Sequence, residues 1–332
     1  MPSEMNRRAF IKDSLLASAG AALASQLGAG RASAQKAAAK AGGAKRPKPP
    51  AEALPQGKIE DLKVSRLLLG GNLLTHYTHS RDLKYVYNLT AHYNTEKKII
   101  ETLALAEQHG INALVVHTVP SVLKTLKKYR DKHGGKMQWI ICPTAGVDDS
   151  LAMYSRQVRE LVDELGVAAI YLWGVRADEL VAKGRMDLVA KAVEKALVAG
   201  VASGVGAHDL KVIVECEKKK VPADFYIKTF HHHRYPSAPR PEQIKGPYRE
   251  VPGYWCSDPK AVIEVMKGVK KPWIAFKVMA AGAIPPGDAF PYVFNSGADH
   301  ILAGMFDFEI AEDVAIAKKA LAGVKRVRPW RS

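Results

Sequence analysis

The 332-residue chain has little cysteine, no long apolar run and fewer acidic than basic residues. Its three cysteines, Cys142, Cys216 and Cys256, have no spacing typical of a zinc ribbon or an iron–sulfur cluster, so we expect buried thiols. The HExxH pattern of helical zinc sites is absent. The apolar run at residues 15–27 is too short to span a bilayer. These absences remove the commonest sequence signs of a metal cluster and of a stable membrane anchor.

Charge is the strongest bias of the composition. Lysine and arginine number 49 against 33 aspartates and glutamates, which gives a formal net charge of +16. The basic residues recur on expected helix faces and do not gather into one arm with interleaved aromatics. Such a pattern is typical of solvated helix surface, and we therefore expect no nucleic-acid partner.

The first 34 residues have the pattern of an address signal. Residues 6–12 read NRRAFIK, a mild apolar run follows, and ASA at residues 32–34 offers the small side chains that a signal peptidase reads. This resembles a twin-arginine export signal, with cleavage expected before Gln35. The resemblance predicts a periplasmic protein that meets the twin-arginine translocase during export. A short membrane anchor is the less favoured alternative.

A change of composition divides the rest of the chain. Residues 35–60 are rich in Ala, Lys, Pro and Gly and have few large apolar residues, which is typical of a disordered linker. We expect ordered structure from near Lys63, and we assign residues 61–332 to one domain.

That domain repeats a β-then-α rhythm eight times. The strands are short continuous apolar runs, as in parallel sheets covered on both faces, and eight units over this length predict a closed (β/α)8 TIM barrel. A doubly wound open sheet is the alternative, but no Gly-rich phosphate fingerprint follows the first strand. The expected strands are residues 64–72, 112–118, 137–144, 168–175, 202–207, 225–230, 273–280 and 300–305.

The carboxyl ends of barrel strands usually carry the chemistry. Three expected strands deliver histidine to that rim, at His117, His208 and His231. Neutral imidazoles there would bind a divalent metal, or would act as general acid and base. We therefore predict these three histidines as catalytic, with the same three as the alternative metal ligands. The third reading is that they are hydrogen-bonded rim residues.

Lys277 stands within an expected strand that is otherwise apolar. A lysine that points into a barrel is costly unless it is paired or reactive. It would then form a Schiff base, bind an anion or hydrogen-bond an enolate, and we add it to the predicted catalytic residues. If it points outward between helices, it has no such role.

Other polar and aromatic residues fall near the same rim or in the loops behind it. Aromatic faces beside polar groups suit sugar rings. The predicted substrate-binding residues are Asn72, His79, Arg81, Trp173, Arg176, Lys228, Arg234 and Tyr235.

In order along the chain, several short stretches resemble the aldo/keto reductases, which are (β/α)8 barrels. The similarity runs over residues 64–324. HSRD at 79–82 and FKV at 276–278 resemble an exported branch of that superfamily, with which no activity comes. The matching stretches are VSRL at 64–67, LGG at 69–71, GIN at 110–112, AVEK at 192–195, GVG at 204–206, IAFKVMAAG at 274–282, GAD at 297–299 and GM at 304–305.

The reductase catalytic tetrad does not carry over. The family's aspartate falls at Val115, its lysine near Cys142 and its histidine near Trp173, and its tyrosine has no match. Relatives in this family hold the extra phosphate of NADP in the loop after the last strand. FDFE at 306–309 places two carboxylates there, and their negative charges would repel that phosphate.

We therefore expect an exported enzyme that has left redox chemistry and acts on a small polar substrate, for which a sugar derivative is one candidate. Histidine and lysine would perform acid–base or metal-assisted lyase, isomerase or hydrolase chemistry. One alternative is an NAD(P)-dependent oxidoreductase with a rebuilt proton relay through His117 or His231. The other is a non-catalytic small-molecule binding protein. The sequence leaves the cofactor open: the histidines would suit a divalent metal, and NAD(P) is less favoured.

Overall fold

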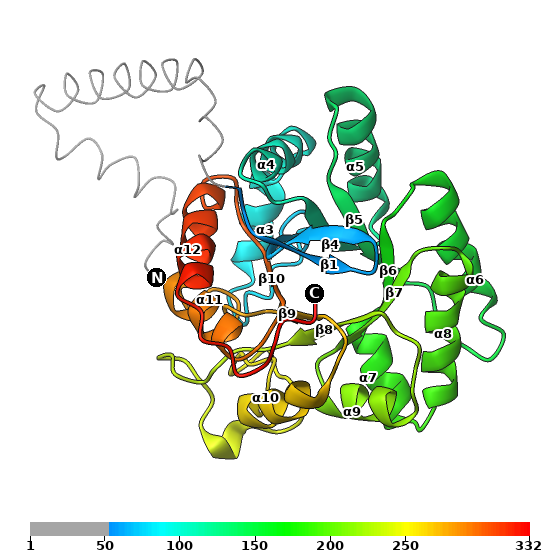
Figure 1. Ribbon diagram of the computed structural model, residues 1–332. Coiled ribbons are helices and arrows are strands. Elements are labelled where there is room, and N and C mark those ends of the chain that lie inside the picture. Colours follow the sequence, from blue (N-terminus) through cyan, green and yellow to red (C-terminus); the bar gives the residue numbers. More distant parts are fainter. Residues whose placement is uncertain (1–52) are drawn as a thin grey trace, which may run out of the picture. The chain divides into compact units, whose positions relative to one another are not determined.

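The computed structural model describes residues 53–332 (Figure 1). The predicted signal peptide at residues 1–34 lies outside the described residues, as does most of the predicted linker at 35–60. Export and cleavage therefore stay predictions. Within the described residues, no helix is both long enough and apolar enough to cross a membrane.

Eight parallel strands close into a barrel, in the order β10-β3-β4-β5-β6-β7-β8-β9, which confirms the predicted (β/α)8 fold. Most strands are one to four residues shorter than expected, because their ends turn into loops. They are β3 (Leu67–Gly70), β4 (Ala113–His117), β5 (Gln138–Cys142), β6 (Ala169–Leu172), β7 (Ala202–Ala207), β8 (Phe225–Thr229), β9 (Trp273–Phe276) and β10 (His300–Ala303).

The helices form the outer ring that covers the barrel (Figure 1). Thr95 and Asp258 accept hydrogen bonds from the first turns of α4 and α10, as N-cap residues do. The predicted helices are α4 (Glu96–Gln108), α5 (Pro120–His133), α6 (Ala152–Arg159) with a π-helical turn η1 (Glu160–Glu164), α8 (Met186–Val198), α9 (Leu210–Lys218), α10 (Pro259–Gly268), α11 (Pro286–Asn295) and α12 (Ile310–Ala322).

Two helices were not expected from the sequence. α3 (Tyr85–Tyr93) lies in the long loop after β3. α7 (Gly174–Ala182) begins two residues after β6 ends, where the sequence suggests a longer strand. The correction matters for function, because α7 carries a carboxylate to the barrel mouth.

Alternate strand residues fill the barrel interior. Leu68, Val115, Ile140 and Phe225 belong to one buried cluster inside the ring, separate from the core under the helices. Gly204 makes room for this packing, since a Cβ at that position would overlap the ring of Phe225. The interior is therefore a packed core and not a pore.

A hairpin of β1 (Gln56–Ile59) and β2 (Leu62–Ser65) precedes the first barrel strand. Ile59 and Val64 are fully buried and belong to the interior cluster, so the hairpin closes the amino-terminal end of the barrel. This corrects the predicted boundary, because β1 lies within the range assigned to the linker. The hairpin buries only a few apolar residues, and they do not form a run long enough to be recognised in the sequence.

The last residues of the chain return to the same end of the barrel. Asp299, which is fully buried just before β10, binds Arg328 at 2.6 Å and Arg326 at 3.1 Å. It also accepts the backbone N–H groups of Trp273 and Arg331. This buried ion-pair network ties the C-terminal segment to strands β9 and β10.

Candidate functional site

The carboxyl-terminal end of the barrel brings two of the predicted catalytic residues into contact. His208 follows β7 directly, and Lys277 follows β9 directly. Their Nε2 and Nζ atoms lie 3.3 Å apart, within hydrogen-bond distance. The amine of Lys277 therefore lies at the barrel mouth, which answers the question of direction that the sequence left open.

The backbone at Lys277 explains how its side chain reaches the mouth. Strand alternation would place it on the outer side of the sheet with Ala275, whereas Phe276 packs against the barrel interior. Lys277 instead has φ +55°, and Ala280 and Ala281 also have positive φ values. Such left-handed residues are strained and cluster at functional sites. The turn redirects the lysine into the mouth.

Lys277 lines a cavity of about 660 Å³ that opens beside the mouth. The indole of Trp255 and the ring of Phe276 also line it, and the Nζ of Lys277 lies 5.2 Å from the Trp255 ring centroid. Burial lowers the pKa of Lys277 to about 7, against the smaller opposing effects of the Glu250 and Asp178 charges. A large share of the amine is therefore uncharged at neutral pH, when it can act as a nucleophile or base.

Asp178 of α7 orients the imidazole of His208. The His208 Nδ1 lies 2.9 Å from the Asp178 Oδ2, and the same carboxylate accepts the backbone N–H groups of His208 and Asp209. A carboxylate only accepts, so Nδ1 carries the proton and Nε2 faces Lys277 with its lone pair. Burial lowers the pKa of His208 to about 4, although the hydrogen bond that its Nδ1–H donates to Asp178 opposes this. The ring is therefore neutral at physiological pH and accepts from the lysine.

A second carboxylate, that of Glu250, acts on Lys277 through its charge, which raises the pKa of the amine. Glu250, in the long loop after β8, lies with its Oε1 2.7 Å from His79 Nδ1 and 3.4 Å from Trp255 Nε1. Its Oε2 is buried and makes no hydrogen bond within residues 53–332. Burial raises the pKa of Glu250, but the hydrogen bond with His79 and the charges of His79 and Lys277 outweigh it and lower the pKa overall. An ionised oxygen without a partner is thus available near the amine.

His117 and His231 do not join this contact. His117 packs edge-on against Tyr77, and burial lowers its pKa. His231 is fully buried, with its Nδ1 2.9 Å from the carbonyl oxygen of His232 and its Nε2 accepting the backbone N–H of Trp255. Because both of its ring nitrogens are used, His231 anchors the long loop.

The alternative of a metal bound by His117, His208 and His231 has no support in this geometry. In the part of the chain that the structure describes, no group of three or more His, Cys, Asp or Glu side chains is arranged to hold a metal ion. His208 and His231 already use their ring nitrogens as described above. The three cysteines are buried free thiols, as expected from their spacing.

Three of the predicted substrate-binding residues line the cavity, namely Asn72, His79 and Arg81. Arg81 also ties loops together, since its guanidinium donates to the hydroxyl of Ser237 and to the carbonyl oxygen of Ala280.

The remaining predicted binding residues lie elsewhere. Lys228 is fully buried, and its amine donates to the carbonyl oxygens of His208 and Thr229, so it supports the rim from behind and is not open to a ligand. The hydroxyl of Tyr235 donates to the carbonyl oxygen of Gly253. Trp173 and Arg176 are half-buried and do not line the cavity, and Arg234 lines a different hollow.

Three residues near this contact were not predicted from the sequence, namely Asp178, Glu250 and Tyr248. The ring centroid of Tyr248 lies 4.5 Å from that of His208. Asp178 lies on the unexpected helix α7, and the other two lie in a long irregular loop. The sequence offered one sign of Asp178. A helix predicted to begin at Gly174 would have placed this acidic residue about one turn after the end of a strand.

Comparisons with known proteins show the fold. No family model matches the chain, and no curated protein matches it. A mutant of Gox0644 in complex with NADPH has a TM-score of 0.52 at 9% identity, covering 84% of this chain and 95% of that one. A putative 2,5-diketo-D-gluconic acid reductase B has a TM-score of 0.48 at 12% identity, with 80% and 88% covered. A phospho-2-dehydro-3-deoxyheptonate aldolase from Thermotoga maritima has a TM-score of 0.48 at 12% identity, with 85% and 80% covered.

At these identities the likeness extends to the architecture alone. The barrel that the resemblance to aldo/keto reductases implies is supported by the likeness to the Gox0644 structure, which extends to the fold alone. Fold alone does not decide function, because one barrel architecture hosts many chemistries. The comparisons establish that this chain is a (β/α)8 barrel protein.

Proposed function

We propose that this protein is an enzyme that uses the Lys277 amine on the carbonyl group of a small polar substrate, as a lyase or isomerase that forms a Schiff base. The observation that carries the proposal is a lysine with a pKa of about 7 in hydrogen-bond contact with a neutral histidine at the mouth of a barrel. An amine that is uncharged at neutral pH has the free lone pair that attack on a carbonyl needs.

The proposed reaction begins with bond formation between Lys277 Nζ and the carbonyl carbon. The carbonyl oxygen takes up one proton that the amine loses and one proton from solvent, and it leaves as water, which gives a protonated imine. That imine draws electrons from the neighbouring carbon, so a C–H or C–C bond there breaks more easily. The Nε2 of His208 faces Nζ at 3.3 Å and is placed to accept a proton from the amine and to return it.

Glu250 is our candidate for the base that acts on the substrate. Its Oε2 has no hydrogen-bond partner within residues 53–332, and His79 holds the other oxygen in place. A carboxylate fixed in this way would accept a proton from a carbon or hydroxyl next to the imine. His79 and Trp255, which both line the cavity, fix its position through hydrogen bonds to the same oxygen, Oε1.

The cavity fits the expected substrate class. Its volume of about 660 Å³ suits a small molecule, and its walls combine the faces of Trp255 and Phe276 with the polar side chains of Asn72 and Arg81. Flat apolar faces beside polar groups suit a sugar-derived compound.

The positions where aldo/keto reductases hold their catalytic residues support chemistry other than hydride transfer. Val115 and Cys142 are buried in the barrel interior, and Trp173 packs against it. His231, one of the two histidines that a rebuilt relay would use, has both ring nitrogens occupied, and the other, His117, packs against Tyr77. We therefore rank the redox alternative second.

Export by the twin-arginine route to the periplasm is part of the proposal, and it rests on the sequence of residues 1–34 alone. Replacing both Arg7 and Arg8 with lysine should leave the protein in the cytoplasmic fraction of its host. Periplasmic protein in the double variant would refute this route.

The proposed function is tested by trapping the imine. The protein is incubated with pyruvate, dihydroxyacetone or glyceraldehyde and reduced with borohydride, and the modified residue is identified by peptide mass spectrometry. We expect at least one carbonyl compound to be reduced onto Lys277 and the adduct to be lost in Lys277→Met.

Lys260→Met, an exposed lysine on α10, is the matched control and should keep the adduct. Labelling spread evenly over surface lysines, or none at Lys277 with any of the three compounds, would refute the Schiff-base proposal.

A further inference from the structure

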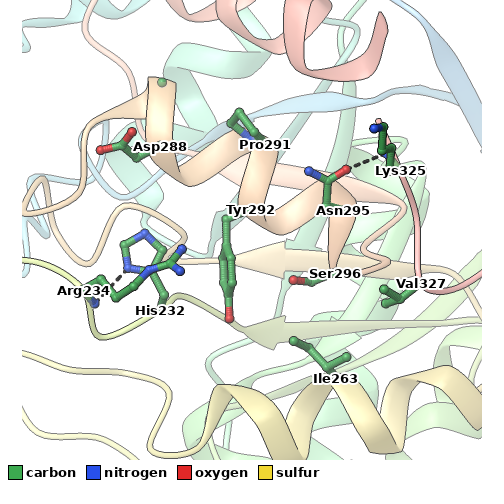
Figure 2. Close-up of a pocket in the computed structure, with 11 residues that line it drawn as sticks. His232, Arg234, Ile263, Asp288, Pro291, Tyr292, Asn295, Ser296, Lys325 and Val327 are labelled. Atoms are coloured by element: carbon green, nitrogen blue, oxygen red, sulfur yellow. Dashed lines mark hydrogen bonds between the residues drawn. The ribbon is translucent and has the colours of Figure 1, made fainter. Parts of the chain in front are cut away.

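A second hollow lies away from the mouth, between helices α10 and α11 and the C-terminal segment. Its volume is about 630 Å³. None of its lining residues belongs to the cavity that contains Lys277. In Figure 2 Tyr292 stands in the middle, with His232 and Arg234 on one side and the residues of the C-terminal segment on the other.

His232 presents a defined hydrogen-bond donor to this hollow. The residue is only 6% exposed, and its Nδ1 accepts the backbone N–H of Arg234 at 3.1 Å. Because Nδ1 accepts, the neutral ring carries its proton on Nε2. No hydrogen bond to that Nε2 is formed within residues 53–332, so the donor is left for something else.

Arg234 adds a positive charge beside that donor. Its guanidinium carbon lies 5.6 Å from the ring centroid of Tyr292, and it forms no ion pair within residues 53–332. Figure 2 shows it next to His232. A guanidinium with five donors is well suited to a planar carboxylate.

The other lining residues determine which charge a ligand should carry and which apolar groups it should present. Lys325 contributes a second positive charge, and Asp288 in the first turn of α11 contributes one negative charge, so the lining is positive on balance. Asn295 uses its Oδ1 to accept the backbone N–H of Lys325, which leaves its amide N–H groups as further donors. The apolar part of the wall is formed by Ile263, Pro291, Tyr292 and Val327.

We propose that this hollow is a second binding site, separate from the barrel mouth, for a small organic anion that joins a carboxylate to a flat or branched apolar group. The carboxylate meets His232 Nε2–H and the Arg234 guanidinium. The apolar group lies against Tyr292 and Ile263. Asp288 lies at the edge and selects against ligands with a second negative charge.

The test uses benzoate as the probe, with benzyl alcohol and benzylamine as its neutral and cationic counterparts, and measures affinity by calorimetry. We expect benzoate to bind and the two counterparts to bind about tenfold more weakly or not at all, since a charge-assisted hydrogen bond is lost. Absence of measurable benzoate binding to the intact protein, or equal affinity for all three, would refute the proposal.

Variants locate the site. Arg234→Gln should weaken benzoate binding about tenfold. His232→Asn keeps an acceptor for the backbone N–H of Arg234 but removes the Nε2 donor, and it should also weaken binding. Arg240→Gln, an exposed arginine on the same loop that does not line the hollow, is the matched control and should leave the affinity unchanged.

Lys277→Met separates this inference from the proposed function. If benzoate bound in the barrel mouth, this variant would change its affinity. We expect no change, and an affinity that depends on Lys277 and not on Arg234 would overturn the second site while leaving the chemistry of the mouth open to its own test.

Discussion

At the scale of single residues, the mouth of the barrel depends on how much water Lys277 loses. Burial lowers its pKa, and the carboxylates of Glu250 and Asp178 recover only part of the loss. The sequence identifies the lysine, because a cation within an apolar strand is unusual. It does not fix the direction of the side chain, since the positive φ at Lys277 overrides strand alternation.

Replacing Asp178 with asparagine should lower the pKa of Lys277 further. The negative charge of Asp178 raises the pKa of both Lys277 and His208, so its removal favours the neutral amine. The pH dependence of Nζ acetylation, followed by mass spectrometry, should move to a midpoint below that of the unmodified protein. The control is Glu242→Gln, which removes an exposed carboxylate from the long loop and should leave the midpoint unchanged. An unchanged or higher midpoint in Asp178→Asn would contradict the proposed effect of Asp178 on the pKa of Lys277.

The same lysine should make stability depend on pH. Its folded-state pKa, about 7, lies below the ordinary value of 10.5, so the folded protein holds the proton less tightly than the unfolded chain. The cost of burying the charge is fully present below pH 7 and disappears as the pH rises through 10.5.

Lys277→Met removes this cost. The variant should gain the most stability relative to the unmodified protein below pH 7, and the gain should shrink as the pH rises towards 10.5. Urea unfolding at several pH values measures the difference. A gain that is constant across this range, or that grows with pH, would show that the amine is not desolvated.

At the scale of elements, the side-chain positions of the histidine run after β8 could not be predicted from the sequence. The run predicts imidazoles in the mouth, but the loop that follows is long and irregular, and its buried backbone groups need partners. His231 accepts the N–H of Trp255, and the Nε2 of His233 lies 2.7 Å from the carbonyl oxygen of Cys256. Such partners depend on loop conformation, which side-chain periodicity does not reveal.

His231→Ala should therefore act on stability and not on the chemistry. Loss of the imidazole leaves the buried N–H of Trp255 without an acceptor, which costs about 1–3 kcal/mol. Urea unfolding should show this loss while borohydride still traps an adduct on Lys277. If the variant keeps its full stability but loses the adduct, His231 belongs to the reaction after all.

At the scale of the whole molecule, the barrel could be predicted because eight apolar runs alternate with helical patterns at regular spacing. That rhythm is a property of the chain alone, and it holds for all eight strands of the barrel. The closure of the amino-terminal end could not be predicted in the same way. It depends on Ile59 and on the ion pairs of Asp299, residues far apart in the sequence.

Asp299→Asn tests that closure. The substitution keeps the shape of the side chain but leaves the buried Arg328 and the largely buried Arg326 without their counter-ion. Breaking one partner of a buried pair costs about 3–5 kcal/mol, which urea unfolding would measure. Since Asp299 and Lys277 lie at opposite ends of the barrel, the midpoint of Nζ acetylation at Lys277 should not move. Unchanged stability would mean that the C-terminal segment contributes little.

The most direct test of the proposed role of Lys277 is a measurement of its pKa. Methyl groups placed on the lysines by reductive methylation give one NMR signal each, and Lys277→Met identifies the signal that belongs to this residue. We predict a titration midpoint of about 7 for that signal. A midpoint near the ordinary value of 10.5 would mean that the amine is charged at neutral pH and would contradict its proposed role as a nucleophile.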